Sequence, residues 1–276
     1  MEISIEQPNV EYPVTVRKQE IIQRMLTNNR RIFGVMGAHL THLDDPSMKS
    51  KLPEGWVCKN LQVEKSKRTD VSNSIASWLQ DKPNAVMIMS LKTPNIEPDF
   101  DKTGLYIGFS DAIIVVGSHI MVITMHSYRG GKDDGEHVVK YSADSNGFVT
   151  TASGRSVDGG DNVTTPIIKA WADLLQAPID NDEELTFIGA HVMLADHISM
   201  VRLTGWWQTV KEQYCYILEQ SRLLEQLSQW YAKIDDSEKS YISTGLVAQL
   251  AQYMVRPYSR IQEMLQKSHV NISNLV

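Results

Sequence analysis

Apolar positions recur at helical spacing in two segments of the N-terminal third of the chain. They fall on one helical face in residues 17–26 and again in residues 71–79. Thr69 or Asp70 offers a side-chain oxygen that caps the second helix, and Pro83 ends it. We therefore expect a helix that begins at about residue 70 and leads into the middle of the chain.

Short apolar runs bounded by turn residues predict strands through the middle of the chain. Residues 85–91 form the first run. Residues 112–116 and 120–123 are joined by Gly117-Ser118, a tight connection typical of a hairpin. Pro166 is well placed to open a further helix. The remaining predicted strands are residues 137–141, 147–151, 185–194 and 198–203.

From Trp206 the apolar period is helical again for about 28 residues, and the same period returns between Ile242 and Met254. This pattern predicts a C-terminal helical hairpin. The alternation of helices and strands before it is typical of an α/β or α+β protein with a mixed central sheet. The chain thus divides into an N-terminal extension (residues 1–64), an α/β core (65–205) and a C-terminal helical appendage (206–276).

The composition is ordinary for a globular protein of 276 residues, with a net charge of −6. This charge argues against a broad nucleic-acid surface. A local basic surplus between residues 47 and 69 is either a solvated loop or a phosphate or partner contact, for which Lys65, Lys67 and Arg68 are the candidates. The chain has neither an apolar run long enough to span a membrane nor a start typical of a signal peptide. We expect no membrane association, and a place in the cytoplasm or in an intracellularly assembled particle.

The segment VITMHSYRGG (residues 122–131) ends the second strand of the predicted hairpin with polar side chains. Together with the order of elements, it resembles the nuclease-related domain (NERD) family, a branch of the PD-(D/E)XK nuclease fold. In that family a strand begins with an aspartate, and its hairpin partner ends in a pattern like V-I-E-x-K-x-Y-R-G. Asp111 stands at the strand start here, and Tyr128-Arg129 matches the ending. The resemblance covers roughly residues 65–205 and implies a mixed sheet of PD-(D/E)XK type flanked by helices, with Arg129 as a nucleic-acid contact.

The departures from the family pattern fall on the catalytic positions. Thr124 and His126 stand where the family has a metal-binding glutamate and a catalytic lysine. An active site would hold Mg²⁺ with Asp70, Asp111 and, as a replacement from the adjacent strand, Glu136. Mg²⁺ prefers hard, charged oxygen ligands, so the uncharged hydroxyl of Thr124 is a poor substitute. His126 replaces the permanent cation of a lysine only when it is protonated.

Three interpretations remain open at this point. The first is a nuclease fold with an eroded site and no cofactor, which serves as a binding or assembly component of a larger complex, one that handles nucleic acid being an option. The second is an active, divergent Mg²⁺-dependent nuclease in which Asp111 and His126 are catalytic. The third is an unrelated α/β structural or interaction protein in which the hairpin is only a packed hairpin. Whether the chain is an enzyme stays open.

Large aromatic residues and isolated histidines add two smaller hypotheses. Aromatic anchors carry interface energy, so we expect a homo-oligomer or a subunit of a larger complex that uses Trp206, Trp207, Trp230 and Tyr231. His39 and His42 have a spacing that can share a metal on one helical turn, but no helical period surrounds them and no further ligand is located. For His191, near a predicted turn, a structural role is favoured.

Overall fold

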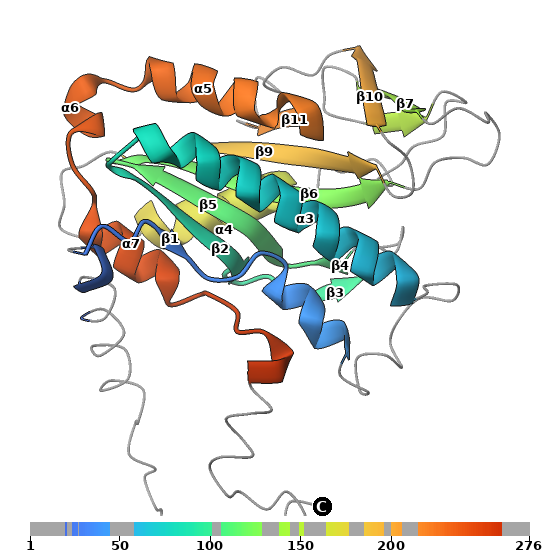
Figure 1. Cartoon of the computed structure of the whole chain (residues 1–276), viewed down its shortest axis with the longest axis horizontal. Coiled ribbons are helices and arrows are strands. Elements are labelled where there is room, and N and C mark those ends of the chain that lie inside the picture. Colours follow the sequence, from blue (N-terminus) through green and yellow to red (C-terminus); the bar gives the residue numbers. More distant parts are fainter. Residues whose placement is uncertain are drawn as a thin grey trace, which may run out of the picture.

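The computed structural model describes residues 20, 24–26, 28–44, 58–100, 106–128, 138–143, 149–151, 164–176, 185–195, 200–205 and 215–260. Its centre is a six-stranded mixed sheet in the order β1-β2-β5-β6-β9-β11, with helices packed against both faces (Figure 1). The predicted α/β class with a mixed central sheet is therefore confirmed.

The strands of the central sheet run in both directions. β1 and β2 are parallel, β5 is antiparallel to both β2 and β6, and β6, β9 and β11 are parallel. Their bounds are β1 Ile32–Phe33, β2 Ala85–Lys92, β5 Phe109–Val116, β6 His119–Tyr128, β9 Thr186–Ala195 and β11 Cys215–Glu219. Two smaller sheets contain β3 (Asp99–Phe100) with β4 (Tyr106–Ile107), and β10 (Met200–Gly205) with β7 (Val138–Ala143) and β8 (Val149–Thr151).

Two hydrophobic clusters fill the two faces of the central sheet. Ile75 and Trp78 of α3 (Cys58–Trp78) and Leu227 of α5 (Leu223–Lys233) cover one face. Trp171 of α4 (Thr164–Gln176) and Leu250 of α7 (Thr244–Ala251) cover the other. Because β2 and β5 are buried on both faces, their sequences read as continuous apolar runs.

The remaining helices are short. They are the 3-10 helices η1 (Ala38–Asp44), η2 (Leu79–Asp81) and η3 (Gln220–Arg222), and α6 (Asp236–Lys239). Among the helices that the structure describes, none combines the length and the apolar character needed to cross a membrane.

The predicted strands and hairpin agree well with the structure. Val116 pairs with His119, so the β5–β6 connection is the two-residue loop Gly117-Ser118, as expected. Gly117 takes the left-handed φ of +55° that such a tight hairpin turn requires. The strands predicted at 137–141, 147–151 and 198–203 also exist, as β7, β8 and β10, but they pair with one another in a separate sheet.

Two predictions about element boundaries are wrong. α3 begins at Cys58, so Asp70 lies inside the helix, exposed, and does not cap its start. Residues 215–219 of the predicted helix after Trp206 form strand β11 instead, because a short apolar run does not by itself distinguish strand from helix and here pairing with β9 decides. β1 and β11 both lie outside residues 65–205, so the sheet extends beyond the predicted core.

Candidate functional site

The strand β5 loses its regular pairing on both sides at Asp111. On the β6 side the register ends with Ala112 opposite Ile123. On the β2 side the register passes from Met89–Ala112 to Leu91–Ser110 and leaves out Ser90 and Asp111. Ser90 has a left-handed φ of +53°, which interrupts the pleat of β2 opposite Asp111. This irregularity brings polar side chains together inside an otherwise apolar sheet.

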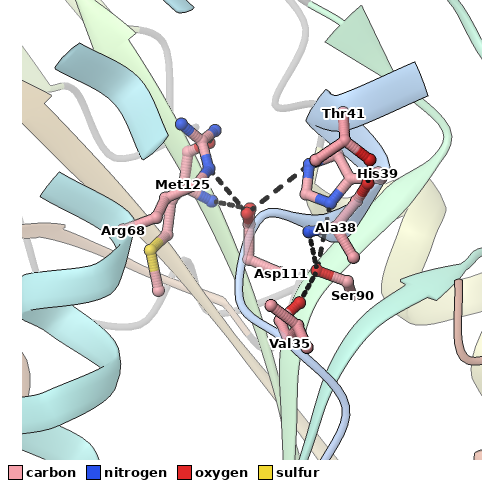
Figure 2. Close-up of polar contacts among 8 residues, drawn as sticks. All are labelled: Val35, Ala38, His39, Thr41, Arg68, Ser90, Asp111 and Met125. Atoms are coloured by element: carbon pink, nitrogen blue, oxygen red, sulfur yellow. Dashed lines mark hydrogen bonds and ion pairs between the residues drawn. The ribbon is translucent and has the colours of Figure 1, made fainter. Parts of the chain in front are cut away.

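Asp111 forms a buried cluster with Arg68 of α3 and the backbone of Met125 (Figure 2). Nε of Arg68 donates to Oδ1 of Asp111 over 2.7 Å, and the Met125 N–H donates to Oδ2 over 2.6 Å. Nη2 of Arg68 also donates to the Met125 carbonyl. Asp111 and Arg68 are each only 3% exposed. Both carboxylate oxygens are therefore engaged, and the two Met125 backbone groups beyond the end of the β5–β6 pairing have partners.

His39 approaches the same carboxylate from η1, as Figure 2 shows. Its Nε2 lies 3.7 Å from Oδ1 of Asp111, and its Nδ1 lies 3.3 Å from Oγ of Ser90. The Ser90 hydroxyl donates to the Val35 carbonyl over 2.8 Å and accepts from the Ala38 N–H over 3.0 Å. Burial lowers the pKa of His39 to about 4 although Asp111 opposes this shift, so the imidazole is neutral at pH 7.

Ser90, His39 and Asp111 follow the order hydroxyl, imidazole, carboxylate that is used in nucleophilic hydrolysis. Their contacts favour a structural role instead. Ser90 is completely buried, and its short donor bond goes to the Val35 carbonyl rather than to the imidazole. Asp111 is already paired with Arg68. The array therefore fastens residues 35–39 to β2, at the point where β2 is irregular.

A second polar group lies on β6 and β9. Thr124 is opposite His191 in the parallel register, and its Oγ1 lies 3.5 Å from Nδ1 of His191. The rings of His126 and His191 are stacked, with centroids 5.0 Å apart and planes inclined by 21°. Among the described residues, no hydrogen-bond partner exists for the buried Nε2 of His126. The position of the family's lysine thus holds a stacked imidazole inside the protein.

Burial keeps both of these imidazoles neutral. The pKa of His191 is lowered to about 4 by burial, with Asp111 opposing. Burial also lowers the pKa of His126 far below its usual value, and the nearby His191, Arg68 and His39 add to this shift. A neutral imidazole does not provide the positive charge that a lysine would bring to a phosphorus centre.

The predicted metal ligands do not come together in the described part of the chain. Asp70 lies two residues after Arg68 on α3, a rotation of roughly 200° around the helix, and it is exposed while Asp111 is buried. Glu136 lies outside the described residues. Among the residues that are described, no three His, Cys, Asp or Glu side chains form a group able to hold a metal. With Asp111 paired to Arg68 and only a hydroxyl and imidazoles beside it, the residues present do not fit Mg²⁺.

Two of the predicted nucleic-acid and partner contacts, Arg68 and Trp230, are buried inside the protein. Arg68 is not on a solvated basic surface, because it is buried against Asp111. Lys65 and Lys67 are partly buried on the same helix and stay candidates, and Arg129 lies outside the described residues. Trp230 is not an exposed anchor, since it is 6% exposed and part of the core under α5.

Tyr231 is partly buried, and its ring packs edge to face against the ring of Trp78, with the ring centroids 5.7 Å apart. This aromatic contact joins α5 to α3 within one chain. Trp206 and Trp207 lie outside the described residues, so their predicted interface role stays a prediction.

Sequence reasoning did not assign Ser90 or His39 to the Asp111 cluster. His39 had been paired with His42, but the imidazole of His42 bonds the Arg256 carbonyl over 2.9 Å while His39 faces Ser90. The available signal was a serine inside the apolar run of β2, because a polar side chain there needs buried partners. His191 gives the same signal inside β9, although it had been expected at a turn.

Comparison of the chain with known protein families, with characterised proteins and with solved structures gives no match. The resemblance to the NERD family therefore rests on the residues quoted from the sequence.

Proposed function

We propose that the chain is a protein of nuclease-like fold with an eroded active site, which acts as a binding or assembly component of a larger complex inside the cell. The observation that carries this proposal is the occupation of both Asp111 oxygens, by the Arg68 guanidinium and the Met125 N–H. A nuclease would need this carboxylate to face a metal ion. Here it faces a permanent cation that belongs to the protein.

The energetics favour a structural use of this carboxylate. Separating a buried ion pair leaves an uncompensated charge, which typically costs about 3–5 kcal/mol. A metal ion would have to displace Arg68, and it would find only the Thr124 hydroxyl where the family has a second carboxylate. The neutral His126 adds no positive charge at the lysine position. Each of the three positions that carry catalysis in the family thus supports a packed interior.

An active Mg²⁺-dependent nuclease is the second candidate, and the Asp111–Arg68 pair weighs against it. The third candidate is an α/β interaction protein unrelated to nucleases. It would have the same non-catalytic role as the proposed protein but a different evolutionary origin. The proposal for nucleic acid as a ligand of the complex rests on Lys65, Lys67 and Arg129 only.

A cleavage assay tests the proposal directly. Wild type and Asp111→Asn are incubated with single- and double-stranded DNA and with RNA, each with Mg²⁺ or Mn²⁺. We expect neither protein to cleave any substrate, and we expect light scattering of the wild type to reveal a stable assembly with itself or with a copurified partner. Glu225→Ala, which removes an exposed carboxylate on α5, is the matched control. Metal-dependent cleavage that disappears in Asp111→Asn and survives in Glu225→Ala would contradict the proposal.

A further inference from the structure

A groove lies between the edge strand β1 and helix α3. Its volume is about 700 Å³, and it is lined from the strand side by Arg30, Arg31, Ile32 and Gly34 and from the helix side by residues that include Asn73 and Ser77. β1 is the last strand in the sheet order, and no described strand pairs with its outer side. The groove therefore borders an edge at which a further strand can be added.

The backbone of β1 offers hydrogen-bonding groups toward this groove. The Arg31 carbonyl accepts from the Met87 N–H over 2.8 Å and so points toward β2. Successive residues of a strand direct their backbone groups to opposite sides, so those of Ile32 point outward. The Ile32 carbonyl accepts from Nε of Arg30 over 3.3 Å, a contact on the exposed side. A side chain thus covers the edge that another strand would pair with.

The charge and the apolar surface of the groove suggest the chemistry of its ligand. Its lining includes two arginines and no acidic residue. Its apolar lining residues are Ile32, Ala76 and Leu79. An extended peptide with carboxylates and β-branched apolar side chains fits both features.

We propose that this groove receives residues 2–6 of a second copy of the chain as an added strand. The segment reads EISIE, in which isoleucines alternate with polar residues at the period of a strand, without a proline. Residues 1–16, which lie outside the described part of the chain, contain three glutamates and no lysine or arginine. The negative charge of this N-terminal segment is complementary to the positive charge of Arg30 and Arg31 in the groove. This inference rests on the proposed assembly role, for which it names the partner and the contact.

The course of the chain before β1 favours a second copy over the same copy as the source of the strand. Leu26 packs in the cluster of α4 and α7, on the face of the sheet opposite α3. The groove lies on the α3 side. The described residues just before β1 therefore lie on the face of the sheet opposite the groove, and we take a neighbouring copy as the source of the added strand.

In the assembled state an N–H of the incoming strand replaces Arg30 at the Ile32 carbonyl. The released guanidinium then binds a carboxylate of Glu2 or Glu6, an ion pair in which both groups are charged, whereas the Ile32 carbonyl that it leaves is uncharged. Ile3 and Ile5 share one face of the segment, and this face meets the apolar part of the groove at Ile32 and Ala76.

The test is disulfide trapping between two singly substituted full-length chains. One carries Ser4→Cys and the other Ser77→Cys, so a disulfide between the two new cysteines forms only between copies. The matched control places the cysteine at Ser66, which is also exposed on α3 but does not line the groove. Peptide mass spectrometry identifies the joined cysteines and separates them from Cys58 and Cys215. We expect the Ser4–Ser77 pair to cross-link and the Ser4–Ser66 pair to remain separate.

A second measurement does not depend on oxidation. Ser77→Trp fills the groove and should weaken self-association, measured by light scattering, by at least about tenfold, or about 1.4 kcal/mol, whereas Ser66→Trp should leave it unchanged. Ser4→Pro removes an N–H of the added strand and should also weaken self-association. Equal cross-linking at both helix positions, or a monomeric wild type, would overturn the inference. A monomer without nuclease activity would leave the non-catalytic role intact with a different partner.

Discussion

Arg68 and Asp111 form a buried ion pair that joins helix α3 to the start of strand β5, with Nε and Oδ1 2.7 Å apart. Removing either partner leaves the other charge buried. We therefore expect Arg68→Met and Asp111→Leu each to lower the free energy of unfolding by about 3–5 kcal/mol, measured by urea denaturation. The exposed pair Lys92–Glu97, at 3.6 Å, is the control, and Lys92→Met should cost less than about 1 kcal/mol.

The double variant Arg68→Met with Asp111→Leu distinguishes pairing from simple packing. Because neither charge remains, its loss of stability should be smaller than the sum of the two single losses by about 1–3 kcal/mol. Strict additivity would mean that the two side chains act independently, and it would remove the main argument against a metal at Asp111.

Three buried histidines predict a loss of stability in mild acid. The pKa values of His39 and His191 are lowered to about 4 and that of His126 lies well below its usual range, in each case mainly through burial. The unfolded chain, with pKa values near 6.5, binds protons that the folded chain does not bind between about pH 6.5 and pH 4. Stability should therefore fall as the pH falls through this window, by up to about 1.4 kcal/mol per pH unit for each histidine. Urea denaturation from pH 7.5 to pH 4.5 measures the slope.

His126→Leu should make this slope smaller. The substitution removes one of the three groups and also a buried nitrogen for which no partner exists among the described residues. We expect stability at pH 7 to stay the same or rise, since an unpaired buried polar group costs about 1–3 kcal/mol. Leu224→Ala, which shortens a side chain that is 37% exposed and removes no titratable group, should leave the slope unchanged. A slope equal in wild type and His126→Leu would show that His126 does not contribute.

The sequence predicted the elements well and the site only in part, for a physical reason. β2, β5 and β6 are apolar runs bounded by turn residues, so their local sequence is enough to indicate strands. The site depends on contacts between residues far apart in sequence: Arg68 with Asp111, Ser90 with His39 and Thr124 with His191. Such pairings follow from the packing of the sheet and helices and not from local spacing.

The position of Arg68 on the face of α3 that covers the sheet could have been recognised from the sequence. Arg68 belongs to a local run of basic residues, which suggested a solvated surface. It also lies three residues before Val71 and seven before Ile75, and both of these are buried on the α3 face that covers the sheet. A charged residue on that face needs a buried counter-charge, and Asp111 was already a candidate site residue. Reading the helix from Cys58, rather than from Asp70, would have placed Arg68 on this face.

Trp230 should behave as a core residue in mutagenesis. Its side chain is 6% exposed and belongs to the cluster beneath α5. We expect Trp230→Ala to lower the free energy of unfolding by about 3–5 kcal/mol, because it leaves a cavity. Leu224→Ala on the same helix, where the side chain is 37% exposed, should change stability by less than about 0.5 kcal/mol. If the Trp230→Ala protein kept normal stability but showed a smaller molar mass of the assembly in light scattering, Trp230 would be an interface residue as the sequence predicted.

Gly117 should tolerate no side chain, because α6 closes over the hairpin turn. A Cβ at this position would lie 2.3 Å from Oε2 and 2.7 Å from the carbonyl oxygen of Glu238. The Glu238 carboxylate accepts from the N–H and the hydroxyl of Ser118, over 2.7 Å and 2.8 Å, and the Ser118 N–H is the main cause of its lowered pKa. Moving Glu238 away would break these bonds, and the left-handed φ of +55° adds strain of about 1–3 kcal/mol for a non-glycine residue.

We therefore expect Gly117→Ala to lower the free energy of unfolding by more than about 1 kcal/mol, measured by urea denaturation. Gly245→Ala is the matched control, since no atom lies within 4 Å of its added Cβ and α7 is helical there. That substitution should raise stability by up to about 1 kcal/mol, because alanine is the better helix former. If Glu238→Ala combined with Gly117→Ala were no less stable than Glu238→Ala alone, the loss at Gly117 would come from the contact with α6. A loss that persists in the double variant would come from the Glu238 backbone carbonyl, which the alanine keeps at 2.7 Å from the added Cβ, together with backbone strain in the turn.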